Sequence, residues 1–217
     1  MAQREARRKD CIEAVSIVTP NHVHFGPAKA FLEAGIHVIC DKPLTSKLED
    51  ALALADVQPK NGAKFLLTHN YTGYPMIRQA REMIANGDIG TLRVVQVEYA
   101  QDWLSEPLEK TGSKQAGWRT DPAQTGAGGS TGDIGTHAFN LVEFMTGRKV
   151  TRLAAQLRSV IPGRTIDDDG AAFFELDNGA AGQLTASQAP SRPRVPLNRG
   201  RTSTVDGLMP VSECSLS

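Results

Sequence analysis

A lysine that could contact a substrate stands at the end of a predicted strand. Residues 36–40 are mostly β-forming, and an acid, Lys42 and Pro43 follow them at once. This order is typical of a buried parallel strand that surfaces at its carboxyl end, where ligands of open α/β sheets bind. Because Pro43 disfavours helical backbone at the preceding residue, the chain itself directs Lys42. Its ammonium could donate to a substrate oxygen, although a surface lysine in an ordinary turn explains this stretch at least as well.

An acid and a histidine form a second candidate pair, after a glycine-rich loop. Asp133 and His137 stand four residues apart at the start of a predicted helix, so their side chains should share one face. A histidine near its unperturbed pKa can accept a hydroxyl proton at neutral pH. The alternative is structural, with Asp133 complementing the helix dipole and His137 lying partly buried in the core.

Other candidate clusters are weaker. The three aspartates at 167–169 suggest a metal loop, but no ligand spacing follows them, and an acidic turn before a strand explains them better. The remaining histidines are spaced too irregularly for zinc, so we predict no metal site. Trp118 and Arg119 lie in a glycine-flanked loop, where the guanidinium could contact a ligand or only pack the loop.

The elements that position these residues alternate in the first part of the chain. Apolar runs predict strands, and between them lie helical patterns, the second with a capping box at 46–49 and an end at 61–62. The runs are 14–18, 36–40 and 65–68, and the first helix is 22–34. Strands and helices that alternate through short connections indicate a parallel sheet.

The pattern changes after an amphipathic helix that begins at Pro75 and ends at 86–87. Strand patterns at 92–99 and 153–157, and a hairpin turn at 177–179, then predict an antiparallel sheet. One more helix spans 134–145 and ends at a glycine. The first sheet is therefore expected to be followed by an α+β unit that begins near residue 88.

Composition limits the partners of the protein. Twenty-four basic and 24 acidic residues balance, so we expect neither nucleic acid nor a membrane as a partner. No apolar run reaches transmembrane length, and the three scattered cysteines fit neither a disulfide framework nor a zinc cluster. These observations predict a cytoplasmic protein with reduced thiols.

Four short motifs, in this order and at these intervals, resemble the Gfo/Idh/MocA family (glucose-fructose oxidoreductase, inositol dehydrogenase, MocA). They are Thr-Pro-Asn-His at 19–22, Asp-Lys-Pro at 41–43, Trp-Arg at 118–119 and Gly-Asp-Ile-Gly-Thr-His at 132–137. The similarity runs from about residue 11 to about residue 189. It implies an oxidoreductase that exchanges hydride between NAD or NADP and a secondary alcohol of a sugar or cyclic polyol.

The resemblance also implies a role for each matched residue. Lys42 would contact the substrate, His137 would be the general acid/base, and Asp133 would be its partner at the substrate. The residues implied to flank the cofactor are Thr19, Pro20, Asn21, His22, Asp41, Lys42, Trp118 and Arg119.

Three departures from the family pattern stand out. Asp41 replaces the usual glutamate and keeps the carboxylate, whereas Asn140 replaces a frequent acid and bears on substrate choice. The glycine fingerprint of dinucleotide folds is missing, because 126–131 lacks its third glycine and follows no strand. We therefore expect the first strands of the nucleotide fold to lie before residue 1, and the chain to be a fragment.

The expected fold class is α/β: a partial Rossmann-like parallel sheet followed by an α+β domain with a largely antiparallel sheet. The predicted domains are 1–87 for NAD(P) binding, 88–189 for substrate and oligomerisation, and 190–217 for a disordered tail. The full-length protein should form a homo-oligomer. A non-catalytic dinucleotide-binding sensor and an inactive remnant are the alternatives, but a sensor needs no proton acceptor, so the enzyme is favoured.

Overall fold

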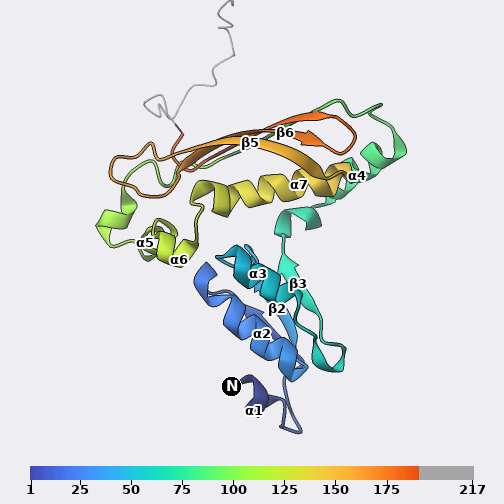
Figure 1. The fold of residues 1–217 in the computed structure, drawn as a ribbon, viewed down its shortest axis with the longest axis vertical. Coiled ribbons are helices and arrows are strands. Elements are labelled where there is room, and N and C mark those ends of the chain that lie inside the picture. The colour runs from blue at the N-terminus through green and yellow to red at the C-terminus, as the bar shows by residue number, and fades with distance from the viewer. Residues whose placement is uncertain (191–217) are drawn as a thin grey trace, which may run out of the picture.

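The computed structural model describes residues 1–190, which form two sheets with their helices (Figure 1). The predicted disordered tail lies outside the described residues, apart from Pro190. Within this part of the chain, no helix is long and apolar enough to cross a membrane. The helices and strands are α1 (Ala2–Glu5), β1 (Ala14–Ile17), α2 (Phe25–Ala34), β2 (His37–Asp41), α3 (Leu48–Ala55), β3 (Phe65–Thr68), α4 (Pro75–Asn86), β4 (Val94–Ala100), α5 (Lys114–Arg119), α6 (Pro122–Thr125), α7 (Thr136–Thr146), β5 (Val150–Arg158), β6 (Asp169–Leu176) and β7 (Ala181–Ser187). Single turns complete them: η1 (Asn21–Val23), η2 (Lys60–Gly62), η3 (Asn70–Gly73), η4 (Leu108–Thr111) and the π-helical η5 (Thr131–Gly135).

The first sheet is parallel, as predicted, with the strand order β1-β2-β3. Helices α2 and α3 pack on it, and Leu32 and Leu54 join Val38 and Cys40 in its core. The predicted burial of strand β2 holds on one face only, because Val38 and Cys40 are buried whereas Ile39 on the opposite face is 37% exposed. Burial alternates along β2 because these helices cover the face that carries Val38 and Cys40.

The predicted capping box and the predicted end of its helix are also wrong. Helix α3 begins after Lys47, without a side-chain cap, and the carbonyl of Ser46 instead lies close to Gly126. The helix ends at Ala55, and the Asn-Gly pair at 61–62 forms a separate turn. Pro59 stands between the two, and proline does not continue a helix.

The second sheet is largely antiparallel, as predicted, with the order β4-β7-β6-β5. Among the described strands of this sheet, only the β4–β7 pair is parallel, and the hairpin turn at 177–179 joins β6 to β7. Helix α7 covers one face of this sheet (Figure 1), and Val142 of the helix packs there with Phe174 and Leu184. On the opposite face Phe173 is 65% exposed. This arrangement leaves an open sheet surface that includes an aromatic side chain.

Candidate active site

A cleft of about 640 Å³ opens at the carboxyl ends of the three parallel strands. Thr19 follows β1, Asp41 and Lys42 lie at the end of β2, and Thr68 ends β3. The Thr68 hydroxyl donates to the Asp41 carboxylate at 2.8 Å, which joins two of the strand ends. The cleft is therefore where ligands of open α/β sheets bind.

A second cavity of about 480 Å³ adjoins the first. Its far side is lined by aromatic and amide side chains of η3, β4 and the following loop, among them Tyr71, Tyr99, Gln101 and Trp103. The residues shared by both cavities are Lys42, Asn70, Gln115, Arg119, Asp133 and His137. The three residues predicted to be catalytic thus lie where the two cavities meet.

Lys42 reaches from the parallel sheet to the turn that carries Asp133. Its Nζ donates to Asp133 Oδ1 at 2.5 Å and to the Asp133 backbone carbonyl at 2.5 Å. The two side chains are 16% and 20% exposed, so water screens the ion pair weakly. The Lys42–Pro43 peptide bond is cis. The contact between Lys42 and Asp133 fixes the ammonium at the boundary of the two cavities.

The Asp133 carboxylate also forms an ion pair with Arg119 and accepts a hydrogen bond from Gln188. Arg119 Nε lies 3.4 Å from Oδ2, and Gln188 Nε2 donates to the same oxygen at 2.8 Å. Burial alone raises the pKa of Asp133, but Lys42, Arg119 and Gln188 together outweigh burial and lower that pKa below its usual value. Asp133 is therefore ionised at neutral pH.

Asp133 and His137 do not share one continuous α-helical face, which corrects the prediction. Asp133 lies in the π-helical turn η5, where the Thr136 N–H donates to the Thr131 carbonyl five residues earlier. His137 lies in α7, and among the described residues no side-chain hydrogen bond joins it to Asp133. Both side chains still line both cavities, because the wider turn only changes their relative direction.

His137 is buried among aromatic rings. The ring centroids of Tyr71, His69 and Tyr99 lie 4.6, 6.3 and 6.3 Å from its own. Burial, with the charge of Lys42 and then His69, lowers the pKa of His137 to about 4, and Asp133 offsets only part of this. The expectation of an unperturbed pKa is wrong. The ring is neutral at pH 7 and can accept a proton.

Most of the residues predicted to flank a cofactor line the larger cleft. They are Thr19, Pro20, Asn21, Asp41, Lys42, Trp118 and Arg119. The Asn21 amide is committed to the chain, since it donates to the Thr125 carbonyl at 2.9 Å. His22 lines neither cavity, and its Nδ1 lies 3.2 Å from the Gln124 carbonyl oxygen. These two residues therefore tie η1 to α6.

A histidine that the sequence reasoning passed over joins two loops of the cleft. His24 is fully buried, with one ring nitrogen 2.9 Å from the Thr19 carbonyl oxygen and the other 2.8 Å from that of Pro43. The ring thus connects the loop after β1 to the loop that holds Lys42. The only sequence signal was its place two residues after the Thr-Pro-Asn-His motif.

A tyrosine pair was also missed, because no spacing in the sequence connects its members. The hydroxyls of Tyr71 and Tyr99 lie 2.5 Å apart, and Gln101 donates to the Tyr99 hydroxyl at 3.1 Å. The hydrogen bond with Tyr99, followed by burial, raises the pKa of Tyr71 to about 12. The Tyr71 hydroxyl therefore stays protonated at neutral pH, and the tyrosine pair gives the second cavity a polar wall.

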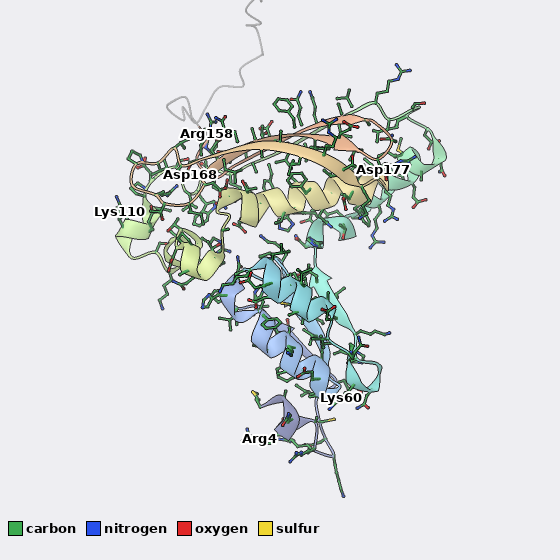
Figure 2. The ribbon with its side chains drawn as sticks, viewed as in Figure 1. Arg4, Lys60, Lys110, Arg158, Asp168 and Asp177 are labelled. Carbon is green, nitrogen blue, oxygen red and sulfur yellow. The ribbon has the colours of Figure 1, made fainter. Side chains whose placement is uncertain are left out.

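The aspartates at 167–169 bind protein groups. Asp168 is buried against Arg164 at 3.1 Å, and Asp169 accepts from Arg158 Nε at 2.9 Å. Arg158 and Asp168 lie at the same end of the second sheet, away from Asp177 (Figure 2). Asp167 accepts from the backbone of Gly129 and Thr131. No group of acids, histidines or cysteines within the described part of the chain could hold a metal ion. The interpretation of 167–169 as an acidic turn before a strand is consistent with these contacts.

Comparisons with known proteins place this geometry in context. Residues 3–82 match the profile described as "Oxidoreductase family, NAD-binding Rossmann fold", and residues 77–205 match that of the "GFO/IDH/MocA C-terminal domain". The crystal structure of an inositol dehydrogenase homolog complexed with NAD+ from Azotobacter vinelandii is 38% identical, with a TM-score of 0.81. That match covers 86% of this chain and 48% of the other. The expected fold class is confirmed.

Two curated relatives are also named as an oxidoreductase and a dehydrogenase. Uncharacterized oxidoreductase YfiI of Bacillus subtilis is 34% identical over 86% of this chain and 48% of its own length. Levoglucosan dehydrogenase of Pseudarthrobacter phenanthrenivorans is 32% identical over 79% of this chain and 42% of its own length. The chain therefore spans about half the length of the curated relatives it matches. The domain boundaries at residues 87–88 and 189–190 remain predictions.

Replacing Lys42 tests the electrostatics of the site directly. In Lys42→Met the pKa of His137 should rise above about 4, because a nearby cation disfavours the protonated ring and the variant removes that cation. Titration of the histidine ring signals by NMR measures this shift. Lys29→Met, which removes a lysine paired with Glu33 on α2, is the control and should leave His137 unchanged. An unchanged or lower His137 pKa in Lys42→Met would contradict the assigned electrostatics.

Proposed function

The chain belongs to the Gfo/Idh/MocA family of oxidoreductases, and we propose that the protein oxidises a secondary alcohol of a sugar or cyclic polyol with NAD or NADP. The observation that carries this proposal is the meeting of Lys42, Asp133 and His137 at the boundary of two cavities. Because the chain covers about half of its relatives, the activity is proposed for the protein at its full encoded length.

The larger cleft fits a dinucleotide. It lies at the carboxyl ends of parallel strands, and Thr19, Asp41 and Trp118 line it and would hold the cofactor there. When bound, a nicotinamide supplies the acceptor for the hydride that leaves the alcohol carbon. The free cysteines of the described residues, Cys11 and Cys40, suit a reducing compartment, so we place the reaction in the cytoplasm.

The proposed mechanism assigns the proton and the developing charge to two side chains. A neutral ring nitrogen of His137 accepts the hydroxyl proton, and the alcohol becomes a ketone. The Lys42 ammonium donates to the alcohol oxygen as negative charge develops there, an interaction stronger in the transition state than in the bound alcohol. Asp133 holds that ammonium in place through two contacts.

The second cavity fits an uncharged, polyhydroxylated ring. Tyr99, Gln101 and Gln115 offer hydroxyl and amide groups to substrate hydroxyls, and Trp103 offers an aromatic face. The cations that reach it, Lys42 and Arg119, share the carboxylate of Asp133. Relatives named for levoglucosan and inositol support the same substrate class.

A homo-oligomer is also proposed, with the open face of the second sheet as the contact between copies. On this face Phe173 and Val94 are 65% and 62% exposed, among polar residues such as Gln183 and Thr185. Several exposed apolar side chains on an open sheet face, rimmed by polar residues, are typical of a surface that another protein covers. A second copy of the chain supplies the same surface, as in a two-fold interface.

The pH dependence of oxidation tests the proposed function. In the full-length protein, kcat/KM should be level around neutrality and fall below about pH 4, because only neutral His137 accepts a proton. His137→Asn should slow oxidation on the order of 10²-fold or more and abolish this limb. His22→Asn, which alters a histidine outside both cavities, should retain the limb. Dinucleotide binding without turnover of any polyol would favour the sensor.

Light scattering tests the proposed interface. Phe173→Asp should shift the full-length protein toward the monomer, since burying an unpaired charge between two copies is unfavourable. Leu48→Asp, which changes a leucine on α3 that is 73% exposed, is the control and should leave the mass unchanged. A monomeric wild type, or an unchanged oligomer in Phe173→Asp, would reject this face as the interface.

A further inference from the structure

The turn that leads into the Asp133 segment is built around one buried carboxylate. Asp167 Oδ1 accepts from the Gly129 N–H at 2.6 Å, and Oδ2 accepts from the Thr131 N–H at 2.8 Å. The Ser130 hydroxyl donates to Oδ2 at 3.2 Å, and the Ser130 N–H donates to the Asp167 backbone carbonyl at 2.9 Å. Four hydrogen bonds therefore join three consecutive residues of the turn to Asp167.

This contact leaves no space for adjustment. A Cβ atom on Gly129 would lie 1.9 Å from the Asp167 carbonyl oxygen, so the two backbones touch. Ser130 is fully buried, and its hydroxyl also lies 3.2 Å from the Ala186 carbonyl oxygen on β7. The turn is consequently fixed to the second sheet before the helix begins.

The residues that Asp167 holds are those from which the wide turn starts. The Gly129 carbonyl accepts the Asp133 N–H at 2.8 Å, and the Thr131 carbonyl accepts the Thr136 N–H. A continuous α-helix would stack Asp133 and His137 on one face. In the observed turn Asp133 meets Lys42 and Gln188, whereas His137 meets the ring of Tyr71. The start of the turn thus decides where both side chains point.

We propose that Asp167 is a positioning residue for the reaction, which sets the directions of Asp133 and His137 by fixing residues 129–131. This inference rests on the proposed function. Asp167 lines neither cavity, so it touches neither cofactor nor substrate in this account. Asp169 provides a matched control, because it is an aspartate two residues away whose carboxylate binds Arg158 and not the turn.

The test is Asp167→Asn in the full-length protein. The amide keeps the size of the carboxylate but directs an N–H₂ group at one of the backbone N–H groups, so the turn must shift. We expect kcat to fall on the order of 10²-fold, as small misplacements of catalytic groups do. The Kd for NADH should change far less than kcat, since Thr19 and Asp41, which are proposed to hold the cofactor, lie at strand ends of the other sheet, and Asp133 and His137 form only one part of the cleft wall. Asp169→Asn should keep both values.

A second variant approaches the same contact from the other side. Gly129→Ala adds a methyl group that has no room against Asp167. Like Asp167→Asn, it should lower kcat with little change in the Kd for NADH. Where either protein fails to fold, Ser130→Ala removes one hydrogen bond to Asp167. It should lower kcat by a smaller factor than Asp167→Asn does, again with little change in the Kd for NADH. Wild-type kcat in these variants, or parallel loss of kcat and NADH affinity, would overturn the positioning role.

The positioning role is separable from the proposed function. If the wild-type protein binds NADH but oxidises no polyol, the proposed function is rejected. The effect of Asp167 on the positions of Asp133 and His137 can still be measured. In that case the pKa of the His137 ring reports the positions of Lys42 and Asp133, both of which shift it. NMR titration should then show a changed His137 pKa in Asp167→Asn and not in Asp169→Asn. An unchanged pKa in both would overturn the inference.

Discussion

The ion pair between Lys42 and Asp133 is the constraint on which the site depends. It joins the end of a strand in the parallel sheet to a turn packed on the other sheet, and its atoms lie 2.5 Å apart. Both side chains are largely removed from water, so truncation of either would leave a poorly compensated charge, which typically costs about 3–5 kcal/mol. The two cavities meet at this contact, and neither sheet alone provides both halves of it.

One charge has two consequences in this arrangement. The Lys42 ammonium lowers the pKa of Asp133 and, after burial, also that of His137, to about 4. A base with so low a pKa is a weak acceptor for an ordinary alcohol proton. In the proposed mechanism the same ammonium also stabilises the developing alkoxide, so it would make the alcohol a stronger acid while it keeps the ring neutral. In this proposal the Lys42 ammonium would lower both the pKa of the substrate alcohol and the pKa of the His137 base.

The sequence predicted the features that local patterns determine. Proline and glycine mark both ends of α4, the Asp-Asn-Gly turn joins β6 to β7, and an apolar run followed by Lys42 places the lysine at a strand end. The wide turn at Asp133 was not predictable, because its shape depends on Asp167, 36 residues from Thr131. The low pKa of His137 likewise arises from burial that only tertiary packing creates.

A double-mutant cycle tests the central claim most directly, because it measures whether Lys42 and Asp133 act as one unit. In the full-length protein, kcat/KM for polyol oxidation would be compared among the wild type, Lys42→Met, Asp133→Asn and the double variant. If Asp133 acts by holding the ammonium, the double variant should be about as slow as Lys42→Met alone. Losses that multiply, so that the double variant is slower by the product of the two single effects, would contradict the account.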